Sequence, residues 1–162
     1  MLMIPTPIGD LDAVFDAKGA LTRLMFVPPA SPIAGKLNDV QASAAKLLAD
    51  EISAYFAGRL REFSVPIAPK GTPFQRRVWD RLTGIPYGAT TTYGQIAKEL
   101  GDTKLSRAVG RANGTNPIFL LIPCHRVIGA NGQLTGYAGG LERKAELLKI
   151  EMISLKSNTS HD

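Results

Sequence analysis

The chain is organised around residues 121–128, which read Leu121-Ile122-Pro123-Cys124-His125-Arg126-Val127-Ile128. Cys124 is the only cysteine of the chain, and His125 is one of two histidines. The other histidine, His161, lies next to the C-terminus in a polar tail. A proline cannot continue a hydrogen-bonded ladder, so Pro123 predicts that Cys124 emerges at a turn. Any thiol chemistry therefore depends on Cys124, and any imidazole chemistry depends on His125.

Two interpretations of Cys124 follow from its surroundings. A lone cysteine beside apolar residues is most often a small, buried hydrophobic side chain. Here His125 and Arg126 follow directly, and nearby basic groups lower the pKa of a thiol toward neutrality. The thiolate is the nucleophilic form of cysteine, so this stretch favours a nucleophile. The residues alone leave both interpretations open.

Composition limits the class of protein. The 162 residues, 44% of them hydrophobic, suffice for one domain or two small ones. Lysine and arginine number 19 against 14 acidic residues, and this net charge of +5 suits an anionic partner such as nucleic acid. A single cysteine excludes an internal disulfide and a multi-cysteine zinc site. We see neither a signal peptide nor an apolar run of roughly 18 residues, and expect a cytoplasmic protein without membrane contact.

The first third of the chain predicts a structural domain. Residues 11–15 and 21–27 are typical strands, and the turn residues between them predict a hairpin. From residue 40 to about 57, apolar side chains recur at helical spacing, which predicts that they face a core: Val40, Ala44, Leu47, Leu48, Ile52, Tyr55 and Phe56. Residues 64–73 have the composition of a linker. We therefore expect a strand-and-helix domain over residues 1–63.

The next segment predicts a helix-turn-helix. Thr72 and Thr92 each start a capping-box pattern, so one helix begins near Pro73 and a shorter one follows Thr92. A glycine-containing turn then precedes a second helix over residues 105–113. On this helix Arg107 and Arg111 project from one side, and Lys104 lies at its beginning. The pattern alone is a weak signal, because two ordinary surface helices would show it too.

The remainder of the chain surrounds Cys124. Residues 118–122 predict a short strand that leads to the cysteine, and residues 129–140 form a glycine-rich loop. This loop lacks the spacing of phosphate-binding motifs. Residues 141–153 predict a helix with Leu141, Ala145, Leu148 and Met152 facing inward, and residues 154–162 a flexible polar tail. We expect an α/β (α+β) chain with a small N-terminal sheet and helix, then a mostly helical domain over residues 74–153.

Several blocks of sequence resemble one known family. Residues 122–128 are similar to the active-site signature of the O6-alkylguanine-DNA alkyltransferases, also called methylated-DNA–protein-cysteine methyltransferases. Further blocks follow in family order: Gly71–Gln75, Ile85–Gly88, Thr92–Ala97, Ser106–Gly110, Asn116–Pro117 and Gly136–Leu141. The resemblance is close from about Gly71 to Met152 and holds only in outline for the first third.

The resemblance implies a single-turnover repair reaction. The protein would flip O6-alkylguanine, and by extension O4-alkylthymine, out of duplex DNA and transfer the alkyl group to Cys124. His125 matches the base that deprotonates the cysteine through a water, and Glu151 matches the carboxylate that orients the histidine. On an extended segment, adjacent side chains point apart and leave room for that water. From the residues alone, Glu142, Glu146 and Glu151 are equal candidates, and only the resemblance selects Glu151.

The resemblance also implies a DNA-binding surface and a base pocket. Arg107 matches the arginine that fills the space left by the flipped base, and small residues such as Ala108 and Gly110 suit a helix in the minor groove. Tyr93 matches the tyrosine that rotates the nucleotide. Other matching pocket positions are Asn116, Val127, Tyr137 and Ala138. We expect no metal and no cofactor, and a monomer; cooperative binding on DNA stays open.

Three other functions compete with this hypothesis. A non-catalytic helix-turn-helix protein would bind alkylated DNA without accepting the alkyl group. A cysteine hydrolase would need an imidazole opposite its cysteine, whereas His125 is adjacent to Cys124 in the sequence. A pure interaction module would leave the basic helix and the glycine-rich loop unexplained. The stoichiometry of alkylation separates these functions from alkyl transfer.

Overall fold

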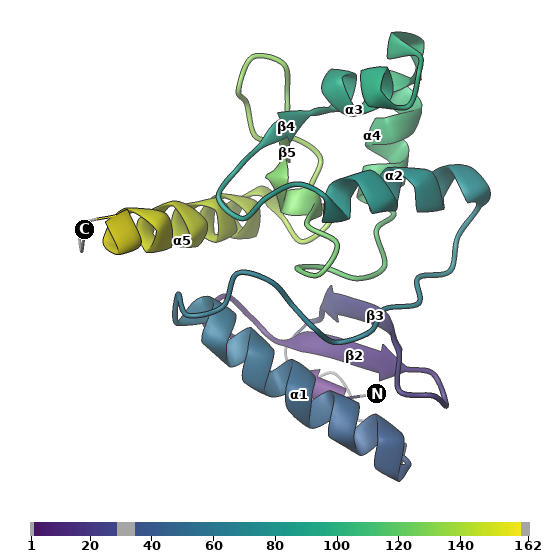
Figure 1. Cartoon of the computed structure of the whole chain (residues 1–162), viewed down its shortest axis with the longest axis vertical. Helices are drawn as coiled ribbons and strands as arrows, with labels where there is room; N and C mark the ends of the chain where they lie inside the picture. Colours follow the sequence, from purple (N-terminus) through teal and green to yellow (C-terminus); the bar gives the residue numbers. More distant parts are fainter. Residues whose placement is uncertain (1, 29–34, 160–162) are drawn as a thin grey trace. The chain divides into compact units, whose positions relative to one another are not determined.

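A computed structural model describes residues 2–28 and 35–159, and the chain divides into two compact units (Figure 1). The first unit contains Met1–Lys70 together with Pro117–Phe119, and the second contains Gly71–Asn116 and Leu120–Asp162. A small antiparallel sheet and several helices give the α+β organisation that the sequence predicts. Within the described residues, every helix is too short or too polar to span a membrane.

The first unit is built on a three-stranded antiparallel sheet. Its strands β1 (Leu2–Ile4), β2 (Leu11–Phe15) and β3 (Leu21–Phe26) lie in the order β1-β2-β3. At the turn between β2 and β3, the side chain of Asp16 accepts hydrogen bonds from two backbone N–H groups at 2.9 Å. The predicted hairpin is confirmed. Strand β1 was not predicted, because three residues are too few to show an alternating pattern.

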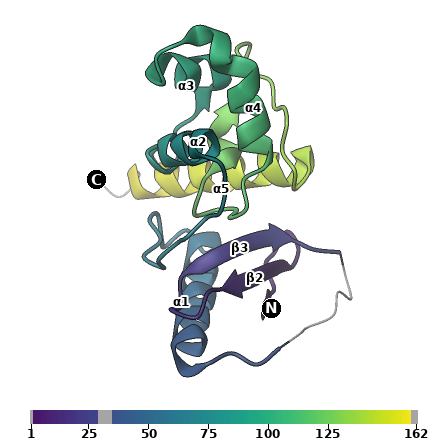
Figure 2. The same cartoon turned by 90° about the vertical axis from the view of Figure 1, so that its right-hand side faces the viewer.

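Helix α1 (Asp39–Phe56) lies along this sheet (Figure 2). Asn38 and Gln41 form a capping box at its start. The core face is formed by Leu48, Ile52 and Tyr55, all at most 1% exposed. The prediction that Val40 and Leu47 also face the core is wrong, since they are 54% and 41% exposed. At about 100° per residue both lie roughly a quarter turn away from Leu48 around the helix.

Residues 117–119 belong to the first unit although they are distant from it in sequence. The backbone N–H of Leu24 donates to the carbonyl of Pro117, and the N–H of Phe119 donates to the carbonyl of Leu24, both at 2.8 Å. Only Ile118 makes a strand-like bridge, so the predicted strand over residues 118–122 is wrong. The extended backbone ends at Leu120, whose φ of 70° is left-handed.

The second unit contains the predicted helix-turn-helix. Helix α2 (Pro73–Thr83) precedes α3 (Tyr93–Glu99), and the 3₁₀ turn η1 (Thr103–Leu105) leads into α4 (Ser106–Gly114). Thr72 caps α2 in the predicted capping box, and Thr92 caps α3. The indole N–H of Trp79 donates to the carbonyl of Ala112 at 2.9 Å and ties α2 to α4. Helix α4 starts one residue later than predicted, because residues 103–105 form the 3₁₀ turn.

A short parallel pair of strands brings the cysteine segment to α3. Residues Cys124–Arg126 form the 3₁₀ turn η2, and β5 (Val127–Ile128) follows it. Strand β5 pairs with β4 (Thr91–Thr92), which ends where α3 begins. Tyr93, the first residue of α3, therefore lies beside the segment that carries Cys124.

Helix α5 (Leu141–Thr159) closes the second unit. Its buried face carries Lys144, Leu147, Glu151 and Ser154. The predicted inward face is wrong: Leu141 and Met152 are 49% and 56% exposed, because the buried row carries charged residues that an apolar pattern does not reveal. The flexible tail predicted from residue 154 is also wrong as far as 159, since α5 continues to that residue. Residues 160–162 lie outside the described part.

Candidate active site

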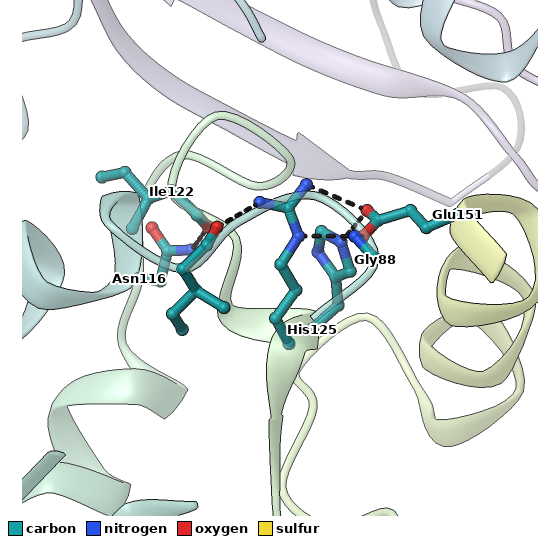
Figure 3. A network of polar contacts seen from close by, with 7 residues as sticks. Gly88, Asn116, Ile122, His125 and Glu151 are labelled. Carbon is teal, nitrogen blue, oxygen red and sulfur yellow. Dashed lines mark hydrogen bonds and ion pairs between the residues drawn. The ribbon is translucent and has the colours of Figure 1, made fainter. Parts of the chain in front are cut away.

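The carboxylate of Glu151 is the centre of a buried polar network (Figure 3). Its Oε2 lies 2.6 Å from Nε2 of His125. The guanidinium of Arg126 donates to both carboxylate oxygens, from Nε to Oε1 at 2.9 Å and from Nη2 to Oε2 at 3.1 Å. The backbone N–H of Gly88 donates to Oε1 at 2.9 Å. Although burial opposes ionisation, the hydrogen bonds and charges of His125 and Arg126 hold the pKa of Glu151 at about 2.

Arg126 is itself fixed by the turn that contains Ile85 and Gly88. Its Nη1 donates to the carbonyl of Ile85 at 2.7 Å, and its guanidinium carbon lies 5.6 Å from the centre of the Tyr87 ring. One turn thus supplies an acceptor for Arg126 and a donor for Glu151. The guanidinium both neutralises and orients the carboxylate, which fits the planar two-point geometry of this pairing.

Gly88→Ala is expected to destabilise the protein more than Gly132→Ala. Both glycines have left-handed backbones, with φ of 78° and 81°, so either alanine costs about 1–2 kcal/mol of backbone strain. A Cβ at Gly88 would also lie 2.0 Å from Cδ1 of Leu155, whereas a Cβ at Gly132 meets nothing within 4 Å. Urea denaturation measures both losses. Equal losses of unfolding free energy in the two variants would show that Leu155 moves aside without destabilising α5.

His125 keeps its second ring nitrogen available. Its side chain is fully buried, and Nδ1 has no hydrogen-bond partner among the residues the structure describes. An ionised carboxylate can only accept, so Nε2 carries the proton toward Glu151 and Nδ1 is the unprotonated nitrogen. Burial lowers the pKa of His125, although the hydrogen bond and charge of Glu151 oppose this. The imidazole is therefore neutral near pH 7 and can accept a proton at Nδ1.

Acid is expected to destabilise the protein through His125 from about pH 6.5 downward. Below that pH the unfolded imidazole binds a proton, whereas the buried one, whose pKa is lowered, does not. The contribution of neutral His125 to the stability of the folded protein is thus complete above about pH 6.5 and is lost as the pH falls below this value. Glu151 acts in the same direction in a separate window, because its pKa of about 2 lies below its usual 4.5.

Urea denaturation between about pH 8 and pH 5 tests the histidine effect. The variant His125→Asn has no titrating group at this position, so its stability should depend less on pH in this range than that of the wild type. The only other histidine is His161, which both proteins share. The same slope in both proteins would contradict the assignment.

The Cys124 thiol is 2% exposed and lies at the start of η2. Its backbone N–H donates to the carbonyl of Ile122 at 2.7 Å. Burial raises the pKa of Cys124 to about 11, while a hydrogen bond from the Asn116 side chain and the charge of Lys144 oppose this. The prediction of a pKa lowered toward neutrality is thus wrong for this site, because burial outweighs the basic neighbours. The predicted extended segment is likewise replaced by a 3₁₀ turn. The sulfur must lose its proton before it can attack.

Lys144 is a buried cation near Cys124 that was not among the site residues predicted from the sequence. Its side chain is fully buried on α5, and Nζ donates to the carbonyl of Thr135 at 2.5 Å. Burial lowers the pKa of Lys144, and the neighbouring Cys124 opposes this shift. The one sequence signal was its spacing from Leu147 and Glu151, which places all three on one face of a helix.

Tyr93 contacts both the glycine-rich loop and α4. Its hydroxyl donates to the carbonyl of Thr135 at 3.2 Å, so this carbonyl accepts from both Tyr93 and Lys144. A Cβ built at Gly136 would lie 3.1 Å from the same hydroxyl, and one at Gly110 would lie 3.8 Å from the ring. The glycine-rich loop and α4 therefore both lie close to Tyr93, and a side chain at Gly136 would crowd its hydroxyl.

The structure places the predicted DNA-contact residues together on α4 and the turn before it. Lys104, Arg107 and Arg111 are exposed, and Ala108 and Gly110 are half-buried. Within residues 2–28 and 35–159 no carboxylate forms an ion pair with these three basic side chains. The exposed face is thus basic, with small residues between the charges.

The remaining predicted pocket residues also lie in the second unit. Asn116 donates from Nδ2 to the carbonyl of Ile122 at 2.7 Å, and Val127 is fully buried in β5. Tyr137 is buried, which raises its pKa, and Ala138 beside it is exposed. Within the described residues no group of three or more histidine, cysteine, aspartate or glutamate side chains could hold a metal ion.

A comparison with known families identifies the domain that carries this site. Residues 73–153, half of the 162-residue chain, match the family described as 6-O-methylguanine DNA methyltransferase, DNA binding domain. The chain belongs to this methyltransferase family. The match includes α2, the helix-turn-helix, the Cys124 segment and Glu151, so the network around Glu151 lies wholly within the family's domain.

Curated members of the methyltransferase family are identical to this chain at more than half of the aligned residues. The methylated-DNA--protein-cysteine methyltransferase of Methanosarcina acetivorans is 61% identical over 101 residues, 62% of this chain and 65% of that protein. The protein of the same name from Methanosarcina mazei is 55% identical over 109 residues, 67% of this chain and 69% of that protein. The matched part therefore spans about two thirds of these relatives' length.

Solved structures of the methyltransferase family extend the likeness to nearly the whole chain. The Mycobacterium tuberculosis O6-methylguanine methyltransferase is 42% identical, covers 94% of this chain and 92% of that one, and has a TM-score of 0.80. The same organism's OGT in complex with DNA is 45% identical with the same coverage and a TM-score of 0.83. These matches confirm the α+β fold class.

Proposed function

We propose that this chain repairs alkylated DNA by transferring the alkyl group from O6-alkylguanine, and by extension from O4-alkylthymine, to Cys124. This proposal depends on the buried Glu151–His125 pair. Among the described residues Nδ1 of His125 has no hydrogen-bond partner, and His125 directly follows Cys124, the chain's only cysteine. Membership of the methyltransferase family and the names of its relatives support the same reaction. The protein would be a single-turnover methylated-DNA–protein-cysteine methyltransferase.

The proposed reaction consumes the protein. Nδ1 of His125 takes the thiol proton, through a water, while Glu151 stabilises the imidazolium that forms. The sulfur then attacks the alkyl carbon, the S–C bond forms, and the C–O6 bond breaks with its electron pair moving to the base. Guanine regains one proton at its ring nitrogen, which balances the one lost by the thiol. The product thioether is stable, so each molecule acts once.

Helix α4 is the proposed contact with duplex DNA. Its exposed arginines would neutralise phosphates, and its small residues would let the backbone approach the minor groove. Arg107 would occupy the space that the flipped base leaves. The protein is proposed to act as a monomer on this partner, without a metal or a cofactor. The known structure of the Mycobacterium tuberculosis OGT with DNA supports a DNA partner for this chain.

The proposed base pocket lies between Tyr93 and Cys124. Tyr93 would give up its bond to Thr135 and direct its hydroxyl to the base, and Asn116 holds the cysteine segment. The carbonyl of Val127 would accept from the amino group of guanine. Tyr137 would form a wall, and the backbone N–H of Ala138 would donate to O6, since alanine has no polar side chain.

Intact-protein mass spectrometry tests the proposed function. The protein is mixed with a duplex that carries one O6-methylguanine, and its mass is followed to completion. The proposal expects a gain of a single methyl, mapped to the peptide that contains Cys124 and saturating at one per molecule. A protein that binds the damaged duplex without a gain in mass would instead be a non-catalytic binder of alkylated DNA.

Arg107→Ala is expected to slow repair of duplex DNA about tenfold or more. An extrahelical base loses stacking and pairing worth a few kcal/mol, and the arginine would offset part of this loss. Transfer from the free base O6-methylguanine needs no flipping, so its rate should stay unchanged and serves as the internal control. Equal rates on the duplex for wild type and variant would contradict the role of Arg107.

A further inference from the structure

Asn113 carries a buried amide that the proposed mechanism does not use. The residue is 2% exposed, and neither Nδ2 nor Oδ1 has a hydrogen-bond partner among the residues the structure describes. Buried amides are nearly always paired, and an unpaired one destabilises the folded protein. A polar group kept unpaired in the interior is typical of functional sites, where a ligand completes its hydrogen bonds.

The position of Asn113 on α4 indicates which ligand would complete the hydrogen bonds of its amide. Side chains three apart are neighbours on a helix, and Arg107, Gly110 and Asn113 form one such row. Asn116 follows just beyond the end of α4, and its backbone N–H donates to the carbonyl of Asn113 at 3.4 Å. Exposure falls along this stretch, from exposed Arg107 through half-buried Gly110 to buried Asn113 and Asn116.

Two residues near Asn113, Gly110 and Asn116, contact the groups that flank the proposed base pocket. Gly110 adjoins the ring of Tyr93, at 3.8 Å from a Cβ built on the glycine. On the other side, the Asn116 side chain hydrogen-bonds the Cys124 thiol. Asn113 therefore lies in the chain between a residue that adjoins Tyr93 and one that hydrogen-bonds the Cys124 thiol, the two groups that flank the proposed base pocket.

We propose that Asn113 is a recognition residue that donates from Nδ2 to the deprotonated ring nitrogen beside the alkylated oxygen. This inference rests on the proposed function. Alkylation at O6 of guanine removes the proton from N1 and turns this nitrogen from a donor into an acceptor. Alkylation at O4 of thymine does the same at N3. The amide N–H of Asn113 can therefore donate to either damaged base.

The same hydrogen bond strengthens during transfer. As the C–O6 bond breaks, its electron pair spreads over O6 and N1, so negative charge grows on the atom that Asn113 contacts. A hydrogen-bond donor that already points at the atom where negative charge develops lowers the barrier to alkyl transfer. The protein does not have to rearrange to stabilise that charge. N1 then takes a proton to give neutral guanine, and Asn113 must release its donor bond. Asn113 thus stabilises the transition state of transfer more than the bound damaged base.

The variant Asn113→Leu tests the proposal, because leucine is similar in size and has no polar atom. The rate of methyl transfer at saturating duplex should fall by roughly 10- to 100-fold. Stability in urea should be unchanged or higher, since an unpaired buried amide is removed. An unchanged rate would overturn the proposal. If the leucine variant does not fold, Asn113→Ala gives the same rate comparison.

A modified substrate identifies the atom that Asn113 contacts. In 1-deaza-O6-methylguanine a C–H replaces N1, so the acceptor is missing from the base. Loss of N1 also makes the base a poorer leaving group, and this slows wild type and variant alike. Wild type should therefore lose more on the analogue than Asn113→Leu does, and the extra factor should match the loss that the variant shows on O6-methylguanine. Rate losses that multiply would show that Asn113 does not contact N1 and would overturn the proposal.

Two controls separate this proposal from its alternatives. Wild type runs beside the variant, so a wild type that gains no methyl would refute the proposed function itself. Equal rates of methyl gain in wild type and variant would refute only the role of Asn113. Reaction of Cys124 with iodoacetamide should be equal in both proteins. A parallel fall in that reaction would mean that Asn113 acts through Asn116 and the thiol rather than on the base, which would overturn the proposal.

Discussion

Cys124→Ala is expected to remove all methyl uptake from a duplex that carries O6-methylguanine. The chain has no second cysteine, and no other described side chain combines a nucleophile with the free nitrogen of His125. The buried thiol is replaced by a smaller apolar side chain, and the exposed arginines of α4 are unaffected. Intact-protein mass spectrometry should therefore detect no gain in mass, whereas binding of the duplex persists.

The binding measurement makes this result specific. Affinity for DNA should decrease with salt equally in wild type and variant, because phosphate contacts release counterions. A variant that no longer binds DNA would show that the substitution disturbed the second unit rather than the acceptor alone. Residual methyl uptake in Cys124→Ala would refute the assignment of Cys124 as acceptor.

Glu151→Gln is expected to slow transfer at least about a hundredfold and to destabilise the protein. The carboxylate orients His125 and balances the charge of Arg126, and it accepts the backbone N–H of Gly88. A neutral amide cannot accept from all three, so it leaves the guanidinium buried without a counter-charge. Breaking a buried pair in this way costs about 3–5 kcal/mol, and a misoriented base loses most of its effect.

Two glutamates on the same helix provide matched controls. Glu142 and Glu146 are exposed on α5, so Glu142→Gln and Glu146→Gln remove the same charge without touching the network. Urea denaturation and the rate of methyl transfer should both stay near wild-type values in these variants. Equal losses in all three variants would indicate a general charge effect of α5 and would contradict the orienting role of Glu151.

Local signals in the sequence were sufficient to predict the hairpin of β2 and β3 and the helices of both units. The turn at Asp16 and the capping patterns at Asn38, Thr72 and Thr92 involve residues a few positions apart, so they form wherever the segment lies. The helix-turn-helix follows from the same kind of signal. Strand formation over residues 118–122 failed as a prediction, because Leu120 adopts a left-handed backbone that no local pattern of apolar residues indicates.

The buried face of α5 shows where an apolar pattern fails. The sequence presents leucine, alanine and methionine at helical spacing, and these positions predict the core side. The structure instead buries Lys144 and Glu151 on either side of Leu147. Each charged group has a partner outside the helix. The lysine donates to the carbonyl of Thr135, and the glutamate pairs with Arg126. Such compensation depends on tertiary contacts, so hydrophobicity along the helix cannot reveal it.

The sequence by itself determined which chemistry is available: one thiol, one imidazole beside it and a basic helix are properties of composition and order. Only the tertiary structure decided how these groups act. It shows why Glu151, the one of three glutamates that the family resemblance implied, can orient the base: its carboxylate contacts His125, Arg126 and Gly88. It also raised the pKa of the thiol that its neighbours in sequence would have lowered. Burial and charge compensation arise between segments far apart in the chain, and these interactions are set by packing.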